Sequence, residues 1–464
     1  MLIRQSKNAF IRIFSRYAYV ENQTNHVSMT YTGDEMKFVS CLSRKAQDLE
    51  CVAGNAGIDI SVAGELAKNL ADLWFVVMGD CEAELDAREV PFSYDVVADV
   101  ERRFAGVQGV MPAEADGEPW LRSLQIEITS YCNERCIHCY IPGEVKECGE
   151  TMPVDRVKAI IDEFADMGGL RIILSGGEFF MHKDTVEILT YCRRRDLMIL
   201  LQSNLTLVDD EMIHFLRELN VFNVQVSLYS TDEATHDMIT RLKGSWRKTK
   251  ENLEKLVANN IPALIACPIM KQNYKGYRDM MDYARSLRLF CYTDYVLLAR
   301  NDFCDANLCT RLSLSQTSEL LDEILAADPA YMDKLSMAES EKNLDAIEFA
   351  QRFNRCSVLK NNICISVNGD AYPCPAWQRM VLGNVHTMPL HDIWVSPQAD
   401  ELRKINVKDF KKCSKCNLHN YCDMCMVYNY NENGGRVDEV CSRFCDVAAM
   451  LRNKIHAMYN DRIK

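Results

Sequence analysis

The stretch Cys132-Asn-Glu-Arg-Cys136-Ile-His-Cys139-Tyr140 carries three cysteines in a C-x-x-x-C-x-x-C spacing. It follows residues 124–129, whose alternation of apolar and polar side chains predicts a strand. Three thiolates at this spacing can bind one face of a cubane iron–sulfur cluster, in which ordinary carriers ligate every iron with cysteine. One iron is then left without a nearby protein ligand, and an open metal position is where a substrate or cofactor binds. A zinc site is the alternative, although zinc sites more often pair two distant C-x-x-C units.

Length and composition limit the classes of function. At 464 residues we expect two or three domains, and the net charge of −13 argues against non-specific nucleic-acid binding. The longest apolar run, residues 73–78, is too short to span a membrane, and we find no secretory signal. Of the 21 cysteines, nine fall between Cys356 and Cys445. Such usage without an export signal predicts metal or redox chemistry in the reducing cytoplasm.

The central region alternates short apolar runs with amphipathic helical patterns, which predicts a parallel α/β sheet. Functional side chains are then expected at the C-terminal ends of the strands. The predicted strands are residues 124–129, 170–174, 198–201, 221–228, 263–269 and 294–298, and the predicted helices are residues 154–167, 183–195, 209–219, 245–258 and 277–287.

Short motifs follow several of these strands. Ser175-Gly176-Gly177-Glu178 follows the second strand, and its glycines let the backbone approach a ligand closely. Asn204 follows the third strand and Ser227 ends the fourth, although an ordinary turn also explains Asn204. The segment 236–246 then reads His-Asp-Met-Ile-Thr-Arg-Leu-Lys-Gly-Ser-Trp. Its His236 and Asp237 favour helix capping, and a solvated helix residue is the alternative for Arg241.

Together these features resemble the radical S-adenosylmethionine (SAM) enzymes, whose fold is a partial (β/α)6 barrel. The resemblance implies that Cys132, Cys136 and Cys139 ligate a [4Fe–4S] cluster whose open iron chelates SAM. Phe179-Phe180 stands where the family has Pro and its neighbour, which changes the local loop. The implied SAM contacts are Tyr140, Gly176, Gly177 and Glu178 (the SAM amino group), Asn204, Ser227, and Arg241 for the SAM carboxylate. The resemblance assigns no catalytic residue.

The C-terminal cysteines resemble those of a SPASM domain, which holds two auxiliary [4Fe–4S] clusters. By order along the chain, the resemblance assigns Cys356, Cys364, Cys374 and Cys425 to one cluster, and Cys413, Cys416, Cys422 and a late cysteine to the other. Cys445 fits the family's ending better than Cys441, and a pair of structural zinc sites is the alternative. Cys304 and Cys309, which follow the sixth strand, stay unassigned.

The N-terminal residues 1–95 combine strand patterns at 9–20 and 26–32 with helical patterns at 33–42 and 62–77. Their order and position resemble a winged-helix-like domain that recognises the leader of a precursor peptide in peptide-modifying radical SAM enzymes. In that family the leader adds a strand to an exposed sheet edge. A packing or dimerisation domain is the alternative. The predicted organisation is this domain at 1–95, a linker at 96–120, the barrel at 121–310, a bridging helical region at 311–349 and the SPASM domain at 350–464.

The resemblance implies a function for the whole chain. SAM is cleaved to a 5′-deoxyadenosyl radical, which takes a hydrogen from a ribosomally made precursor peptide, and a thioether or carbon–carbon crosslink forms. The expected partners are that peptide and an electron donor such as ferredoxin or flavodoxin. The alternatives are a sulfatase-type protein maturase, a peptide epimerase, or a non-catalytic iron–sulfur scaffold or electron carrier.

Overall fold

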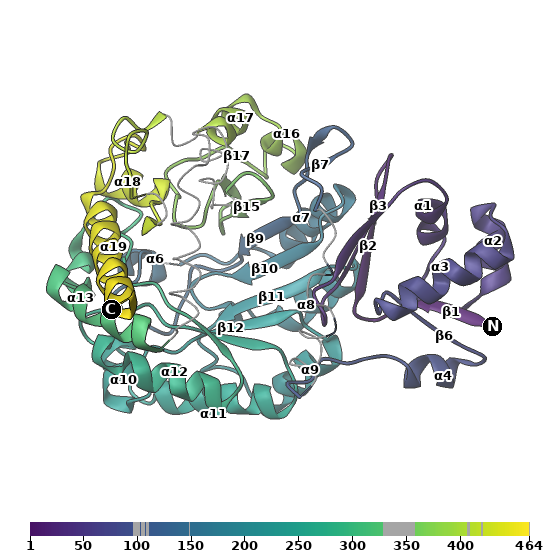
Figure 1. The fold of residues 1–464 in the computed structure, drawn as a ribbon, viewed down its shortest axis with the longest axis horizontal. Coiled ribbons are helices and arrows are strands. Elements are labelled where there is room, and N and C mark those ends of the chain that lie inside the picture. Colours follow the sequence, from purple (N-terminus) through teal and green to yellow (C-terminus); the bar gives the residue numbers. More distant parts are fainter. Residues whose placement is uncertain are drawn as a thin grey trace.

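The computed structural model describes residues 1–95, 103, 107, 111–147, 149–327, 358–405, 409–418 and 421–463. The predicted ligand Cys356 and residues 328–349 of the predicted bridging region lie outside this set. The N-terminal part lies to the right of a central α/β barrel, the C-terminal part lies above and to the left of it, and the two chain ends lie on opposite sides (Figure 1). In the part of the chain that the structure describes, every helix is too short or too polar to span a bilayer.

The N-terminal part contains two three-stranded sheets, ordered β5-β1-β6 and β2-β3-β4, together with four helices. The helices α1–α3 lie on one side of the β2-β3-β4 sheet, because Val20, Met29 and Tyr31 belong to the same apolar core as Val52 and Leu70. The elements are β1 (Leu2–Gln5), β2 (Ala9–Ile13), β3 (Ala18–Asn22), β4 (Ser28–Tyr31), α1 (Gly33–Ser40), β5 (Gln47–Asp48), α2 (Leu49–Ala56), α3 (Ile60–Asp72), β6 (Val76–Gly79) and α4 (Glu82–Ala87).

Two predicted N-terminal elements differ from the structure. The strand predicted over 9–20 is a hairpin of β2 and β3, because the Phe14 N–H donates to the Tyr17 carbonyl at 2.9 Å and reverses the chain. The helix predicted over 62–77 ends at Asp72. Trp74 adopts a positive φ of 62°, and the following β-branched residues form β6 beside β1.

The central part is a partial barrel, which confirms the predicted α/β fold. Its strands run parallel in the order β14-β13-β12-β11-β10-β9. The strands are β9 (Ser123–Glu127), β10 (Arg171–Ser175), β11 (Met198–Ser203), β12 (Asn223–Ser227), β13 (Ala263–Ala266) and β14 (Phe290–Tyr292). The helices are α6 (Gly143–Glu147), α7 (Val154–Asp166), α8 (Thr185–Arg194), α9 (Asp210–Leu219), α10 (Glu233–Thr240), α11 (Ser245–Ala258), α12 (Tyr277–Ser286) and α13 (Leu314–Ala327), with short 3-10 turns at Phe179–Met181, Tyr274–Gly276 and Ala306–Thr310.

The sixth strand is not where the sequence predicts it. It lies at β14, and the predicted segment 294–298 follows as irregular chain. Phe290 and Tyr292 are 69% and 53% exposed on this edge strand, so apolar burial does not mark it. Val296 is buried instead against Cys441 and Phe444, which lie far along the sequence.

The C-terminal part continues the barrel sheet. Strand β15 pairs in parallel with β9, and β16 and β17 extend the sheet to nine strands. The thiol-bearing Cys364 therefore lies opposite Gln125 of the barrel. The elements are β15 (Asn362–Ile365), β16 (Asp370–Tyr372), β17 (Gly383–Asn384), α16 (Leu390–Trp394), α17 (Pro397–Lys404), α18 (Met426–Glu432) and α19 (Ser442–Ile463).

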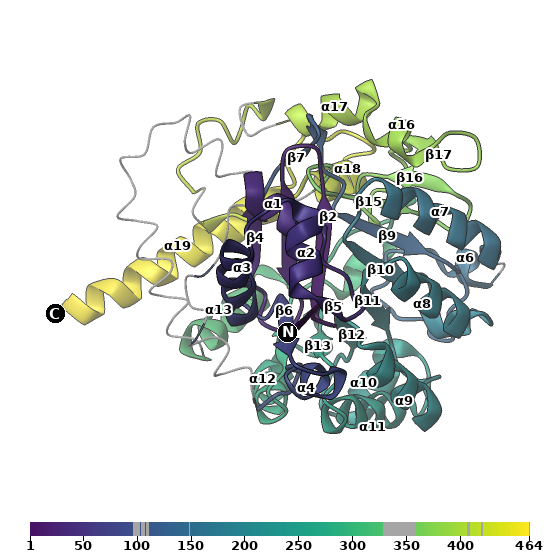
Figure 2. The ribbon, with the colours of Figure 1, turned by 90° about the vertical axis from the view of Figure 1, so that its right-hand side faces the viewer.

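The N-terminal sheet packs against the amino ends of the barrel strands. Phe10, Tyr19 and Trp120 share an apolar cluster with Leu170 and Met198, which stand at the starts of β10 and β11. The β2-β3-β4 sheet thus lies between its own helices and the barrel, at the end opposite the C-terminal ends of the barrel strands (Figures 1 and 2).

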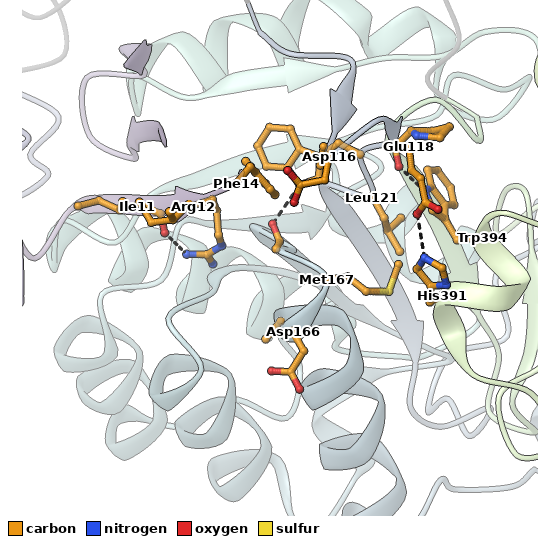
Figure 3. A pocket seen from close by; sticks show the side chains of 16 residues that line it. Ile11, Arg12, Phe14, Asp116, Glu118, Leu121, Asp166, Met167, His391 and Trp394 are labelled. Carbon is orange, nitrogen blue, oxygen red and sulfur yellow. Dashed lines mark hydrogen bonds and ion pairs between the residues drawn. The ribbon is translucent and has the colours of Figure 1, made fainter. Parts of the chain in front are cut away.

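The predicted linker contains a packed hairpin, β7 (Glu114–Ala115) and β8 (Glu118–Pro119). It lies where the three parts meet, beside a cavity of about 400 Å³ that β2, α7 and α16 also line (Figure 3). The Trp394 indole N–H donates to the Pro119 carbonyl at 2.6 Å, and the His391 Nε2 lies 2.8 Å from the Glu118 carboxylate. The hairpin therefore joins the C-terminal part to the barrel.

The His391–Glu118 contact gives a small pH dependence of stability. The hydrogen bonds to Glu118 and then Asp392 raise the pKa of His391 above its usual 6.5. The stabilisation is complete below pH 6.5 and is lost as the pH rises through the folded-state pKa. Since the His391 side chain is 49% exposed, we expect less than about 1 kcal/mol. Urea unfolding at pH 6 and 8.5 should show a smaller pH dependence for His391→Gln, and equal dependence would contradict this contact.

Candidate functional site

The cysteine loop lies at the C-terminal end of β9 and is held by backbone pairing with α10. Arg135 and Ile137 donate their N–H groups to the carbonyls of Thr240 and Ile239, each at 2.9 Å. The Asn204 amide donates to Asn133 at 2.9 Å, which ties the loop to the end of β11. The loop is thus fixed to two neighbouring segments of the barrel.

The ammonium group of Lys146, which is 4% exposed, hydrogen-bonds Cys139 and interacts electrostatically with all three thiols. Burial alone would lower the pKa of Lys146, but Cys139, Cys132 and Cys136 reverse the effect and raise it. Burial raises the pKa of Cys132 to about 11 and that of Cys136 further. Buried thiols of this kind ionise when a metal replaces the proton.

These residues fit an iron–sulfur cluster. In the described ranges, no three His, Cys, Asp or Glu side chains are close enough to share one metal ion. A cubane cluster does not require the three side chains to reach one common point, since each thiolate binds a different iron. The buried cation between the thiols would offset the negative charge of such a group.

A cavity of about 600 Å³, here called the cysteine cavity, opens beside this loop. Its lining includes Cys136, Cys139, Lys146 and the predicted carboxylate ligand Arg241. Arg241 ends α10 with a φ of 55°, so the left-handed turn directs the chain back past the loop. The unassigned Cys309 also lines this cavity, whereas Cys304 is absent from its lining.

Gly176 and Gly177 lie against the backbone that leads into the cysteine loop, where a larger residue would overlap that backbone. A Cβ at either position would stand 2.2 Å from a carbonyl oxygen, that of Thr129 or of Tyr131. The N–H of Gly177 donates to Thr129 at 2.7 Å. Both glycines line a second cavity of about 460 Å³, here called the glycine cavity. Ile141 separates the two cavities, since it lines both.

The predicted SAM ligands Glu178 and Asn204 are already engaged within the protein. The Glu178 carboxylate accepts from the Ser203 hydroxyl at 2.7 Å and from the N–H groups of Asn204 and Phe180 at 2.8 and 3.1 Å. Burial raises the pKa of Glu178. Neither residue lines either cavity. Their SAM contact stays a prediction, and their visible role is to connect β10, β11 and the cysteine loop.

Tyr140 and Ser227, two further predicted cofactor contacts, each have a hydrogen-bond partner within the protein. The Tyr140 carbonyl accepts from the Asn301 N–H at 3.0 Å, and burial, Glu127 and Cys139 raise the pKa of its phenol. Ser227 ends β12, where its hydroxyl hydrogen-bonds the Tyr229 phenol. Both stay predicted cofactor contacts.

Two cysteines predicted for the first auxiliary cluster, Cys364 and Cys425, lie beside the barrel. Cys364 on β15 is fully buried, and burial followed by Glu127 and Cys374 raises its pKa. Cys425 precedes α18 and lies in the cluster of side chains around Val296. The set Cys356, Cys364, Cys374 and Cys425 stays a proposal.

The second predicted set gathers near the start of α19. Burial raises the pKa of Cys422 to about 12, with further contributions from Cys445 and Cys413. Burial, followed by Cys445 and Cys416, likewise raises the pKa of Cys413. Cys441 differs, because its thiol donates to the Glu432 carboxylate at 3.3 Å. We propose that Cys445 rather than Cys441 completes the second set.

Three buried ionisable groups beside these cavities were not singled out from the sequence. Lys146 has no sequence signal, because its position depends on how α6 packs against the cysteine loop. Glu134 lies inside the cysteine motif, where Ser245 donates to its carboxylate at 2.5 Å and burial raises its pKa to about 7. Glu127 does have a signal, since it alternates with Ile126 and Ile128 on a predicted strand.

Comparison with known proteins agrees with this arrangement. Residues 126–284 match the radical SAM superfamily model, and residues 356–417 match the model of an iron–sulfur cluster-binding domain named SPASM. An AdoMet-dependent heme synthase of Nitratidesulfovibrio vulgaris is 23% identical over 70% of this chain and 94% of its own length. The subtilosin biosynthesis protein AlbA of Bacillus subtilis is 25% identical over 68% of this chain and 69% of its own length.

The fold is also similar to that of a solved structure, Streptococcus suis SuiB bound to its precursor peptide SuiA. The TM-score is 0.62 at 15% sequence identity, and the match covers 92% of this chain and 96% of that one. The likeness in fold therefore extends beyond the barrel into the N-terminal and C-terminal parts.

Proposed function

Because this chain is a radical SAM enzyme with a C-terminal SPASM domain, we propose that it modifies a ribosomally made precursor peptide by forming a thioether or carbon–carbon crosslink. The observation that carries this proposal is the N-terminal part. The heme synthase aligns with 70% of the chain, whereas the fold of SuiB, which was crystallised with a precursor peptide, covers 92%. AlbA and the PqqA peptide cyclases among the relatives support a peptide substrate.

The two cavities are proposed to have different roles. When bound, the [4Fe–4S] cluster and SAM supply a 5′-deoxyadenosyl radical that takes hydrogen from the substrate. We propose that Cys132, Cys136 and Cys139 hold this cluster and that Arg241 binds the SAM carboxylate. The contacts of Gly176 and Gly177 with SAM stay a prediction, and the glycine cavity that they line would receive the peptide residue beside SAM and exclude water around it.

The leader of the peptide is proposed to bind β4. This strand is at the edge of the β2-β3-β4 sheet, and an added strand can pair with such an edge. The other edge, β2, is covered in part, since Arg44 and Gln5 donate to the Ala9 carbonyl at 2.8 Å. We therefore propose β4 as the edge to which the leader adds a strand.

Strand addition predicts a local change in hydrogen exchange. Saturating the full chain with leader peptide should slow amide exchange in residues 28–31 by at least about tenfold, because new inter-strand hydrogen bonds protect the amides. The exposed edge β14 provides the control and should exchange at an unchanged rate. Protection of β14 without protection of β4, or protection by a scrambled leader, would contradict the proposed leader site.

The reaction itself is tested by mass spectrometry of the precursor after anaerobic incubation with reductant and SAM. A crosslink gives a loss of two hydrogens together with 5′-deoxyadenosine, whereas an epimerase gives deuterium uptake from D₂O without loss of hydrogen. Sequence similarity to AdoMet-dependent heme synthases favours a second candidate, a SAM-dependent step of heme synthesis. Formation of heme from an added heme precursor, with the peptide unchanged, would replace the proposal.

Two further assignments belong to the same proposal. The cysteine-rich composition supports a reducing compartment, and we place the enzyme in the cytoplasm. A small electron donor such as ferredoxin or flavodoxin would reduce the cluster.

A further inference from the structure

Strand β9 presents different side chains to its two sides. Leu124 and Ile126 pack in the apolar core with the surrounding helices. Gln125 and Glu127 alternate with them and face the other side, where the Gln125 amide donates to the Ser175 hydroxyl at 2.9 Å. Glu127 ends the strand, lines the glycine cavity and is 7% exposed. The strand thus places a buried carboxyl group where the proposed function puts the substrate.

Glu127 is held by one partner only. Its Oε2 accepts a hydrogen bond from the Gln378 Nε2 at 3.0 Å, and in the described chain no hydrogen bond reaches Oε1. The Gln378 amide is oriented by Asn301, whose Nδ2 donates to the Gln378 Oε1 at 2.6 Å. Gln378 can therefore only donate to Glu127, which leaves the second carboxylate oxygen available to a molecule in the cavity.

The surroundings of Glu127 favour proton uptake by its carboxylate. Burial raises its pKa to about 8, and the Gln378 hydrogen bond opposes the rise. The ionisable groups that face it are Tyr140 and Tyr372, whose pKa values are raised by burial, and Cys364, which would be a thiolate when it ligates the proposed auxiliary cluster. No cationic side chain lines the glycine cavity in the described residues. A carboxyl group in this setting can take up a proton without a compensating ion pair.

The other carboxyl groups nearby are either already hydrogen-bonded within the protein or exposed to solvent. Glu178 already accepts three hydrogen bonds, and Glu134 is engaged by Ser245 beneath the cysteine loop. Glu150 lines the same cavity but is solvent-exposed. Among the described residues, Glu127 is thus the buried carboxyl group that lines the glycine cavity and has one oxygen that accepts no hydrogen bond.

Closing a crosslink requires a proton acceptor. When a substrate carbon radical attacks a cysteine thiol, the S–H bond breaks and the C–S bond forms. One proton and one electron are released. In the proposed function the electron passes to an auxiliary [4Fe–4S] cluster of the SPASM domain, whereas the proton needs a base beside the reacting atoms.

We propose that Glu127 Oε1 accepts the proton released when the crosslink closes, with Gln378 as the residue that positions it. This inference rests on the proposed function and adds a catalytic residue to it. The peptide is thereby expected to present its hydrogen-bearing nucleophile, a thiol in the thioether case, toward the end of β9.

The test is Glu127→Gln, which keeps the shape of the side chain and an oxygen for the Gln378 hydrogen bond but cannot take up a proton. Crosslinked product should fall by about 10² to 10⁴-fold. Formation of 5′-deoxyadenosine precedes the proton transfer and should fall far less. Freeze-quenched samples should then show an accumulated substrate radical by electron paramagnetic resonance. Glu127→Asp should recover part of the product, because it retains the base.

Two controls separate the possible failures. Glu211→Gln changes an exposed carboxylate on α9 and should behave as wild type. Iron content and cluster spectra of Glu127→Gln should match the wild type, which excludes a general loss of the fold. If wild-type enzyme makes no crosslink, the proposed function fails. If it does and Glu127→Gln makes crosslink at the same rate, or loses product and 5′-deoxyadenosine equally, the assignment of Glu127 is wrong.

Discussion

Replacing Cys136 by alanine is expected to lower 5′-deoxyadenosine formation from SAM by on the order of 10³-fold or more. Cys136 is one of three thiols around Lys146, and a cubane cluster cannot be held on two of its irons in a site open to solvent. The variant should also contain about four fewer irons per chain. Anaerobic reconstitution followed by iron analysis and product chromatography measures both quantities.

Cys51→Ala provides the matched control for this experiment. Cys51 is an exposed thiol on α2 in the N-terminal part, so its loss should change neither iron content nor SAM cleavage. Full iron content and unchanged SAM cleavage in Cys136→Ala would show that another cysteine, with Cys309 as the nearest candidate in the same cavity, serves in its place.

Replacing Gly177 by alanine is expected to destabilise the barrel by about 3 kcal/mol or more. The added Cβ would stand 2.2 Å from the Tyr131 carbonyl oxygen and 2.5 Å from that of Ser130. These atoms belong to the backbone that leads into the cysteine loop, so no side-chain rotation relieves the overlap. The loop must move, and we expect the iron content to fall together with the urea midpoint of unfolding.

Gly64→Ala is the opposite case within the same chain. Gly64 lies inside helix α3, and a Cβ there meets no atom within 4 Å. Alanine should therefore stabilise the helix by about 0.5 to 1 kcal/mol. Equal urea midpoints for Gly177→Ala and the wild type would show that the backbone beneath the cysteine loop is not as tightly packed as described.

The sequence predicted the architecture well where one short motif or a regular period carried the information. The strand–helix order of the barrel follows from apolar periodicity, and five of the six predicted strands overlap observed ones. β14 was not predicted because its Phe290 and Tyr292 are exposed on a sheet edge. Val296, in the segment predicted instead, is buried by a distant part of the chain. An apolar period in the sequence predicts that a segment is buried, but it does not predict which part of the chain covers that segment.

The candidate site was predictable only in part. The cysteine motif and the glycine pair are visible because their spacing and residue types are unusual. Glu178 and Asn204 were predicted as cofactor contacts, yet their hydrogen bonds lead first to the protein's own backbone and side chains. The position of Lys146 depends on how α6 folds back onto the cysteine loop. The Glu127–Gln378 pair depends on the approach of segments far apart in sequence, which no local pattern records.

The position of the N-terminal sheet at the amino ends of the barrel strands sets a minimum length for any substrate that binds both at β4 and at the glycine cavity. The strands between these sites have five or six residues, which corresponds to roughly 16–20 Å at about 3.3 Å per residue. A peptide passing along the outside of the barrel must therefore place at least about six extended residues between its bound leader and its modified residue. Peptides with a shorter spacer would bind and remain unmodified, so the enzyme would select the position of the modified residue by its separation from the leader as well as by its chemistry.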